Sequence, residues 1–344
     1  MLFLIILGTL LVLILIYLAV IIFLPVLEVK PQKITGTLET IQKAPGYRKN
    51  VEYSVNGETI RSWLYLPENS NKPVPCIILS NGFGGTKDII LEQYAKKFVE
   101  EGYAALALEY RHFGDSDGKP RQLYSSIKQL EDIKASIEFT RSRKEIDPAK
   151  IFLWGTSAGG GYGINAAADD HKICGIIAQC TAFDHKKDDK LVIKREGFSF
   201  LFKLIVHAQR DKGRSRFGLS PHMLPLVGAP GSTSFLNAPG ALEGYSNLIH
   251  ESSKFRNELC PRIMLMKQGE SPITKAKDVE CPILLLVCEK DNLVAPDSHL
   301  KLVEIMKEKV SVVSYPIGHF DIYKGSNFEA AIREQIGFIN NTIE

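Results

Sequence analysis

The chain has 344 residues, of which 45% are hydrophobic, and its formal net charge is +3. That length and apolar fraction are enough to bury a large core, as in a single α/β domain of common size. The small net charge, with no basic stripe interleaved with aromatic residues, argues against a function in nucleic-acid binding.

The first predicted element is an uncharged apolar segment at residues 2–24. About 23 helical residues extend roughly 35 Å, which is enough to cross the hydrocarbon core of a bilayer. A secretory signal usually has a basic start and a shorter apolar core, and no Lys or Arg precedes this segment. We therefore expect a transmembrane anchor at residues 1–30, with a cleaved signal peptide as the alternative.

Two features address the side of the membrane on which the rest of the chain lies. Lys30, Lys33 and Lys43 follow the apolar segment, and the positive-inside rule then places the rest of the chain in the cytoplasm. Most cysteines fall in or at the ends of predicted buried strands, which fits a reducing compartment. These cysteines are Cys76, Cys174, Cys180, Cys281 and Cys288, whereas the segment around Cys260 has no assigned element.

The next elements alternate between strands and helices. Residues 50–55 and 60–67 read as an antiparallel hairpin joined at Asn56-Gly57. Apolar strands then alternate with amphipathic segments such as 89–101 and 127–143, which predicts a mostly parallel sheet covered by helices on both faces. The strands are centred near Ile77, Leu106, Phe152, Ile176, Leu285 and Val312.

A nucleophile site is predicted where the apolar strand at 151–154 runs into Gly-Thr-Ser-Ala-Gly at 155–159. This G-x-S-x-G pattern is typical of a strained turn that exposes a serine, here Ser157, at a strand's carboxyl end. A short strand at 74–80 is followed by Asn-Gly-Phe-Gly-Gly at 81–85, whose backbone can turn amides inward. The expected oxyanion donors are the N–H groups of Phe83 and Ala158. The alternatives are a chance match and an ordinary glycine turn.

The region 183–280 interrupts the alternation and is too long for a simple crossover. We expect a helical cap insertion at about 185–280. Its apolar stretch at 198–206 is expected to line an acyl pocket above Ser157 and to favour medium or long acyl chains, and the alternative is a peripheral helix. The run of mixed charge at 185–190 reads as a solvated turn.

Two further strand ends supply an acid and a base. Asp291 follows the buried strand at 281–288, and His319 follows the strand at 310–315. Because ligands of open α/β sheets bind at the carboxyl ends of the strands, these residues should converge with Ser157. The alternatives are a helix-capping aspartate and a solvated or structural histidine.

These motifs carry a resemblance to a known superfamily. From about Gly36 to the C-terminus, the chain resembles the α/β-hydrolases, in the branch of dienelactone hydrolases, X-Pro dipeptidyl peptidases and fungal polyketide thiohydrolases and transferases. The resemblance rests on residues 81–88, 110–118, 155–159 and 318–320. It implies an α/β-hydrolase fold at 36–344, with Ser157 as nucleophile, Asp291 as acid and His319 as base.

The chain departs from the family pattern in two places. Asn81 stands where the family commonly has histidine, and Ala-Gly-Gly-Gly at 158–161 replaces a more usual Phe-Ser-Gly-Gly. Some family members take their acid from the position of Asp184, which is the other candidate for that role.

Together these features predict a serine hydrolase that cleaves an acyl ester, thioester or amide through an acyl-enzyme. One alternative is a membrane-anchored acyltransferase or thioesterase of lipid or polyketide metabolism. Another is a non-catalytic binding protein of the same fold. The expected partners are a small acyl substrate and the membrane, with no nucleic acid, no cofactor and no metal; the oligomeric state stays open.

Overall fold

A computed structural model describes residues 1–29, 32, 34–38, 47–68, 72–295 and 297–344. Its centre is an eight-stranded sheet in the order β1-β2-β4-β3-β5-β6-β7-β8. The β1-β2 and β2-β4 pairs are antiparallel, and all later pairs are parallel. The strands are β1 Arg48–Val55, β2 Glu58–Tyr65, β3 Val74–Ser80, β4 Ala104–Ala107, β5 Ile146–Thr156, β6 Gly175–Gln179, β7 Ile283–Cys288 and β8 Val310–Tyr315.

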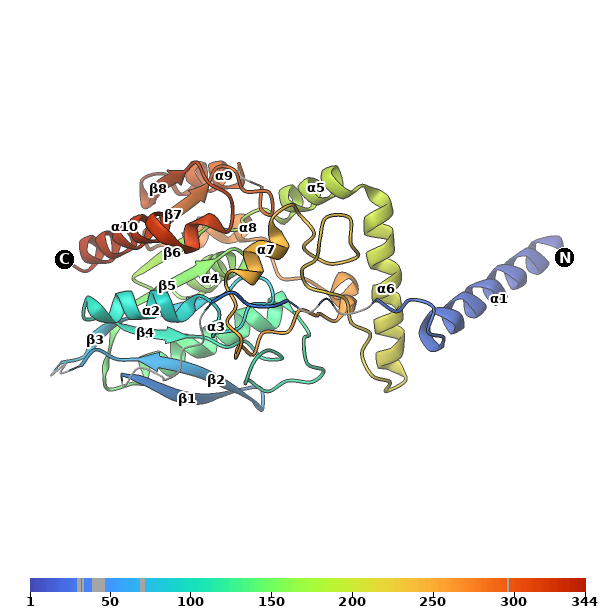
Figure 1. Ribbon diagram of the computed structural model, residues 1–344, viewed down its shortest axis with the longest axis horizontal. Helices are drawn as coiled ribbons and strands as arrows, with labels where there is room; N and C mark the ends of the chain where they lie inside the picture. Colours follow the sequence, from blue (N-terminus) through green and yellow to red (C-terminus); the bar gives the residue numbers. More distant parts are fainter. Residues whose placement is uncertain (30–31, 33, 39–46, 69–71, 296) are drawn as a thin grey trace.

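The predicted mostly parallel sheet is therefore confirmed, and so is the hairpin, which turns at residues 56–57. The predicted strands coincide with β3 to β8. The apolar runs of β3 to β7 are largely buried between the helices on the two faces of the sheet, whereas β8 is an edge strand with no buried residue. Figure 1 shows the sheet at the centre of the body, with the C-terminus at the opposite end of the molecule from the N-terminus.

Helices cover both faces of the sheet, as expected. Side chains alternate between the faces along each strand, so neighbouring residues enter different cores. In β5, Leu153 packs in a core with helices α3 and α4, whereas Trp154 packs in a second core with α2 and α10. These helices are α2 Leu91–Glu100, α3 Ser126–Arg141, α4 Ala158–Asp169, α9 Ser298–Met306 and α10 Gly325–Ile343.

A long insertion separates β6 from β7. It begins with two consecutive helices, α5 (His185–Glu196) and α6 (Phe198–Arg216), which meet at Gly197. Shorter helices and irregular loops follow before the chain returns to the sheet. These are α7 Ala241–Ser246, η1 Pro261–Leu265, α8 Pro272–Lys275 and η2 Ala276–Asp278; η3 Lys307–Lys309 and η4 Asp321–Tyr323 lie later in the chain.

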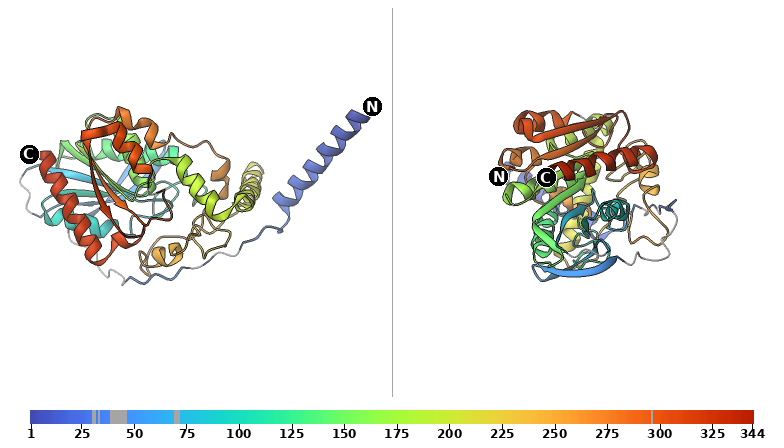
Figure 2. Two further views of the ribbon diagram at one scale, coloured as in Figure 1. Left: turned by 90° about the horizontal axis from the view of Figure 1, so that it is seen from above. Right: turned by 90° about the vertical axis from the view of Figure 1, so that its left-hand side faces the viewer.

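The N-terminal helix α1 (Leu2–Phe23) projects from the body at the side where α6 lies, as the left view of Figure 2 shows. Its mean hydropathy is 3.2, and only 11% of its most apolar window is buried. By length and composition it can cross a membrane. The same properties occur in signal sequences, so the helix does not by itself settle localisation.

Two other sequence features were used to argue localisation, the lysines after the apolar segment and the cysteines. The three lysines used for the orientation, Lys30, Lys33 and Lys43, lie outside the described residues. All six cysteines are free thiols in the part of the chain that the structure describes, and all but Cys174 are buried. Cys260, which had no assigned element, precedes η1 in the insertion.

Candidate active site

Ser157 lies at the sharp turn between β5 and α4. It has φ 53° and ψ −124°, a region that residues other than glycine rarely adopt. The turn holds this conformation partly because the Ser157 amide donates to the Gln179 carbonyl at 2.9 Å. A Cβ on Gly159 would lie 2.5 Å from the Asn81 carbonyl oxygen, so only glycine fits there. Ser157 therefore has the backbone geometry of a nucleophile elbow.

Asp291 and His319 form a buried pair. Asp291 follows β7, and His319 lies in the loop after β8. The Asp291 Oδ2 atom lies 2.5 Å from the His319 Nδ1 atom. The other carboxylate oxygen accepts the amides of Leu293 at 2.8 Å and Val294 at 3.0 Å. The turn after β7 thus fixes one oxygen and leaves the other to orient the imidazole.

The electrostatics of this pair favour a charged imidazole. Burial lowers the pKa of His319, but the carboxylate of Asp291 has the opposite effect and is aided by Cys180. The net result is a His319 pKa raised to about 9. A histidine in this setting binds a proton tightly, so it can act as a general base only in its neutral form, which becomes abundant as the pH approaches that value.

A cavity of about 510 Å³ brings Ser157 and His319 together. Among the residues that the structure describes, the Ser157 hydroxyl makes no hydrogen bond to His319. Such bonds are often long in free enzymes and tighten around a substrate. The walls are largely apolar and come from the loop after β3, the segment leading into α3, α4, the insertion and the loops after β7 and β8. They include Tyr124, Tyr162, Phe235, Leu236, Ile263 and Met264.

The loop after β3 lies against the nucleophile. A Cβ on Gly82 would lie 2.9 Å from the Ser157 Cβ atom. Within the described part of the chain, the amides of Phe83 and Ala158 donate to no other group, and both residues line the cavity. The Phe83 carbonyl accepts a bond from the Tyr245 hydroxyl at 2.8 Å, and the Asn81 side-chain amide donates to the Thr86 carbonyl at 2.5 Å. Tyr245 and Asn81 therefore hold this loop from two sides.

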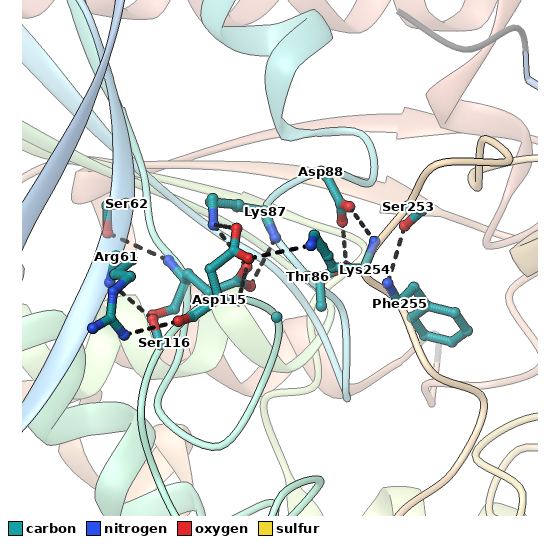
Figure 3. A network of polar contacts seen from close by, with 12 residues as sticks. Arg61, Ser62, Thr86, Lys87, Asp88, Asp115, Ser116, Ser253, Lys254 and Phe255 are labelled. Carbon is teal, nitrogen blue, oxygen red and sulfur yellow. Dashed lines mark hydrogen bonds and ion pairs between the residues drawn. The ribbon is translucent and has the colours of Figure 1, made fainter.

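A buried ion-pair network anchors the same loop, as Figure 3 shows. Lys87 is 2% exposed, and its Nζ atom lies 3.0 Å from Glu109 and 2.9 Å from Asp115. The Lys87 amide also donates to Glu109 at 3.0 Å. Asp88 extends the network to the insertion, because it accepts the Lys254 amide at 2.5 Å. Burial lowers the pKa of Lys87, but Glu109 and Asp115 raise it overall.

Two residues near the cavity differ from expectation. Asp184 caps α5, because its carboxylate accepts the Lys186 amide at 3.0 Å, and it does not pair with His319. The charged run at 185–190 is not a solvated turn but the start of α5, and His185 and Asp188 line the cavity. Burial raises the pKa of Asp188 to about 7, and its Oδ2 atom has no partner among the described residues.

The apolar stretch at 198–206 forms the first half of α6, but this helix contributes none of the described residues that line the cavity. Phe200 and Leu204 instead pack behind the cavity wall against Val192 and Phe235. The expectation that this stretch lines the pocket is therefore wrong. The apolar pattern of this stretch does correspond to a buried helix face. The insertion, however, lines the cavity with residues of α5 and of the segments after α6.

The sequence pattern placed Ser157, Asp291 and His319 at neighbouring strand ends, and the structure brings them together there. The sequence pattern did not indicate that Tyr245, Asp188 and the ion-pair partners of Lys87 lie at or near this site. These residues act through contacts distant in sequence, with 162 residues separating Tyr245 from Phe83. Only the charged residues within the motifs at 81–88 and 110–118 hinted at the network.

The chain is similar to several known proteins. Residues 71–215 match the family model described as serine aminopeptidase, S33. The chain is 35% identical over 315 residues to the quorum-quenching protein AidA of Acinetobacter baumannii, covering 89% of this chain and 98% of that protein. It is 26% identical over 303 residues to the polyketide transferase ATR5 of Stachybotrys chlorohalonatus, covering 86% and 98%.

A solved structure gives the same result for the fold. The structure of DcsB in complex with its substrate analogue superposes with a TM-score of 0.71 and 25% sequence identity. The match covers 86% of this chain and 99% of that chain.

Proposed function

Because the chain belongs to the α/β-hydrolases, in the serine aminopeptidase S33 family, we propose that Ser157 is the nucleophile of a serine hydrolase that transfers an acyl group to water. The observation that carries the proposal is the contact of 2.5 Å between Asp291 and His319, because the His319 side chain lines the same cavity as the strained Ser157. Family membership confirms the expectation of an enzyme over a non-catalytic binding protein.

The proposed reaction begins at the Ser157 hydroxyl. The His319 Nε2 atom takes its proton as Oγ attacks the carbonyl carbon of an ester, thioester or amide. Asp291 holds the imidazole through Nδ1 and stabilises its charged form. The leaving group then departs with the proton from His319. Water, deprotonated by the same imidazole, attacks the acyl-enzyme, and the bond to Ser157 Oγ breaks as His319 returns the proton to that oxygen and the acid is released.

Negative charge develops on the carbonyl oxygen in both steps. The amides of Phe83 and Ala158 are the proposed donors, because each lines the cavity beside Ser157. Removing one such donor in other enzymes costs about 3 kcal/mol of transition-state stabilisation. The bonds from Tyr245 and Asn81 support the proposal, since a preorganised loop needs no reordering during the reaction.

The substrate is proposed to carry an apolar acyl group. The cavity walls offer aromatic and aliphatic side chains from the insertion, including Phe235 and Met264. Apolar walls with few polar groups are typical of sites that recognise a ligand by burial. In this proposal the insertion, about 185–280, acts as a cap on a hydrolase domain at 36–344.

A second candidate function is acyl transfer to an acceptor other than water. It is favoured by the similarity to the polyketide transferase ATR5, which extends over 86% of this chain. The two functions share the acyl-enzyme and differ only in what attacks it. Adding alcohols, thiols or amines during turnover distinguishes them, because a transferase forms the acyl adduct in preference to the free acid.

We further propose that α1 is retained as a single membrane span, with the catalytic domain in the cytoplasm. Helix α1 is apolar along its whole length and contains 22 residues, which corresponds to about 33 Å. Its last turn packs on the body through Ile21 and Ile22, and Arg210 donates to the Leu24 carbonyl, which supports its retention.

The test of the catalytic proposal is Ser157→Ala. The variant should lose ester hydrolysis and labelling by a fluorophosphonate while keeping the wild-type melting temperature, since Ser157 contributes little packing. The matched control is Ser126→Ala, because Ser126 also lines the cavity yet is placed away from His319 on α3. Unchanged labelling of Ser157→Ala would remove Ser157 from its role.

A further inference from the structure

Helix α6 presents an apolar face to solvent beside the C-terminal end of α1. Phe198 and Phe202 are 75% and 67% exposed. Contiguous exposed apolar patches, rather than single exposed residues, mark contacts with a partner or a membrane. The opposite face of the same helix is occupied, because Phe200 and Leu204 pack behind the cavity wall.

The end of α1 covers the other half of this exposed face. The Tyr17 hydroxyl donates to Gln209 at 2.9 Å, and a Cβ on Gly213 would lie 2.5 Å from Ile22. Counting from Phe198, spacings of four, seven and four residues lead through Phe202 and Gln209 to Gly213. In a helix with 3.6 residues per turn, these positions share one side. We name this side the outer face of α6: Phe198, Phe202, Gln209 and Gly213.

The two helices are locked together at this point. Arg210 and Arg214 donate to carbonyl oxygens at the C-terminal end of α1, to Leu24 at 2.6 Å and to Ile22 at 3.2 Å. Two aromatic rings, Phe23 and Phe217, lie 5.1 Å apart at the same junction. The cationic side chains thereby satisfy carbonyls that the helix end leaves without a partner. The position of α6 relative to α1 is therefore fixed by specific contacts.

The length of α1 sets the depth of this junction. A helix of about 33 Å only just matches a hydrocarbon core of about 30 Å, so its last turns lie at the boundary between acyl chains and headgroups. Those are the turns that contact α6. In Figure 1, α6 runs crosswise to α1, which places it along the membrane surface rather than through it.

We propose that α6 lies flat in the headgroup region of the bilayer, with Phe198 and Phe202 inserted among the acyl chains. The inference rests on the proposed retention of α1 as a membrane span. Exposed cationic residues flank the outer face, Lys203 near one end and Arg216 near the other, and they suit anionic lipid headgroups. A membrane-bound cap would bring the wall formed by Val192 and Phe235 close to lipid-dissolved substrates.

The test places a fluorophore on the outer face. Full-length Phe202→Cys and Leu300→Cys are labelled with an environment-sensitive dye and reconstituted into vesicles of phosphatidylcholine and phosphatidylglycerol that carry a quencher near the headgroups. Leu300 is the control because it is 60% exposed on α9, away from α6. The unsubstituted chain, labelled in parallel, gives the background from native thiols.

We expect the quencher to reduce emission from position 202 at least twofold and to leave position 300 unchanged. If the protein floats with vesicles but position 202 is not quenched, the inference is wrong and the anchor stands. A protein that fails to float overturns both. Protection of position 202 that rises with protein concentration and ignores the quencher assigns the face to a second copy, which also overturns the inference.

A second measurement separates membrane contact from a defect in folding. Phe198→Ser with Phe202→Ser in the full chain should hydrolyse a soluble ester as fast as wild type, because neither residue lines the cavity. Its turnover of an ester dissolved in the vesicles should fall several-fold. Equal turnover of the vesicle ester by both proteins would contradict a role for the outer face.

Discussion

Asp184 and Asp291 show how two aspartates at strand ends acquire different roles. Asp184 turns its carboxylate to Lys186 at the start of its own helix. Asp291 uses one oxygen for the turn at Leu293 and the other for His319. The sequence made both plausible, since an aspartate that caps a turn and one that orients a histidine follow a strand in the same way. The two aspartates are distinguished by the loop after β8, which places His319 against Asp291 and not against Asp184.

The first prediction compares these two residues. Asp291→Asn should lower kcat by about 10⁴-fold, because an amide at that position favours the wrong imidazole tautomer. Asp184→Asn should change kcat less than about twofold, since asparagine caps helices as well as aspartate does. Steady-state kinetics on one ester, with melting temperatures for both variants, makes the comparison. The reverse ranking would transfer the acid's role to Asp184.

The second prediction concerns pH. His319 must be neutral to accept a proton, and its pKa is raised to about 9 by Asp291. At pH values below the pKa, the neutral fraction of His319 therefore rises about tenfold for each unit by which the pH increases. We expect kcat/KM for a neutral ester to rise between pH 6 and 8 and to level off above about pH 9. In Asp291→Asn the midpoint should fall toward the ordinary histidine value. A flat profile from pH 6 to 9 would contradict this assignment.

At the scale of elements, the loop after β3 is held by charges rather than by regular structure. Lys87 and Glu109 are both almost fully buried, and their contact joins the loop to the segment after β4. Removing one partner of a buried ion pair leaves a charge without compensation and costs about 3–5 kcal/mol. An exposed pair contributes about 0–1 kcal/mol.

The third prediction uses that difference. Lys87→Met should lower the free energy of unfolding by about 3–5 kcal/mol, because Glu109 is left buried without its cation. The control is Lys97→Met, which removes the partly exposed pair with Glu329 and should cost less than about 1 kcal/mol. Urea unfolding gives both values. Adding Glu109→Leu to Lys87→Met should recover much of the loss, and failure to recover would indicate that packing, not charge, holds the loop.

Elements of the sheet and elements of the insertion differ in how far the sequence predicts them. The strands were predictable because runs such as the one in β7 are apolar throughout and end at turn residues. The length of the insertion made it recognisable in the sequence, but the sequence did not show which face of α6 packs against the core. A helix with apolar side chains on two faces, such as Phe200 and Phe202, does not indicate which face meets the core.

The same limit applies to the site. Ser157, Asp291 and His319 were predictable because each stands directly after a strand in a parallel sheet, where topology alone brings residues together. Tyr245 and Asp188 come from the insertion, and their approach to the cavity depends on loops without a repeating pattern. No local signal in the sequence marks such contacts.

At the scale of the whole molecule, α1 and the body are joined on one side. Ile21 and Ile22 are buried against the body, and Arg210 donates to the end of the helix. Cleavage near Leu27 would remove these side chains and expose the C-terminal half of α6. The membrane anchor proposed above requires that these contacts stay with the mature protein.

The last prediction tests that anchor with a matched pair of proteins. The full chain should stay in the membrane fraction after carbonate extraction, because α1 holds it in the bilayer. A variant lacking residues 2–16 keeps Tyr17 and the turns that pack on α6, but it is too short to span, since about 20 residues are needed. It should be extracted by carbonate and hydrolyse a soluble ester at the wild-type rate. Retention of both proteins would show that α1 is not what holds the chain. A wild-type protein recovered in trimmed form, starting near Leu27, would instead identify a signal peptide.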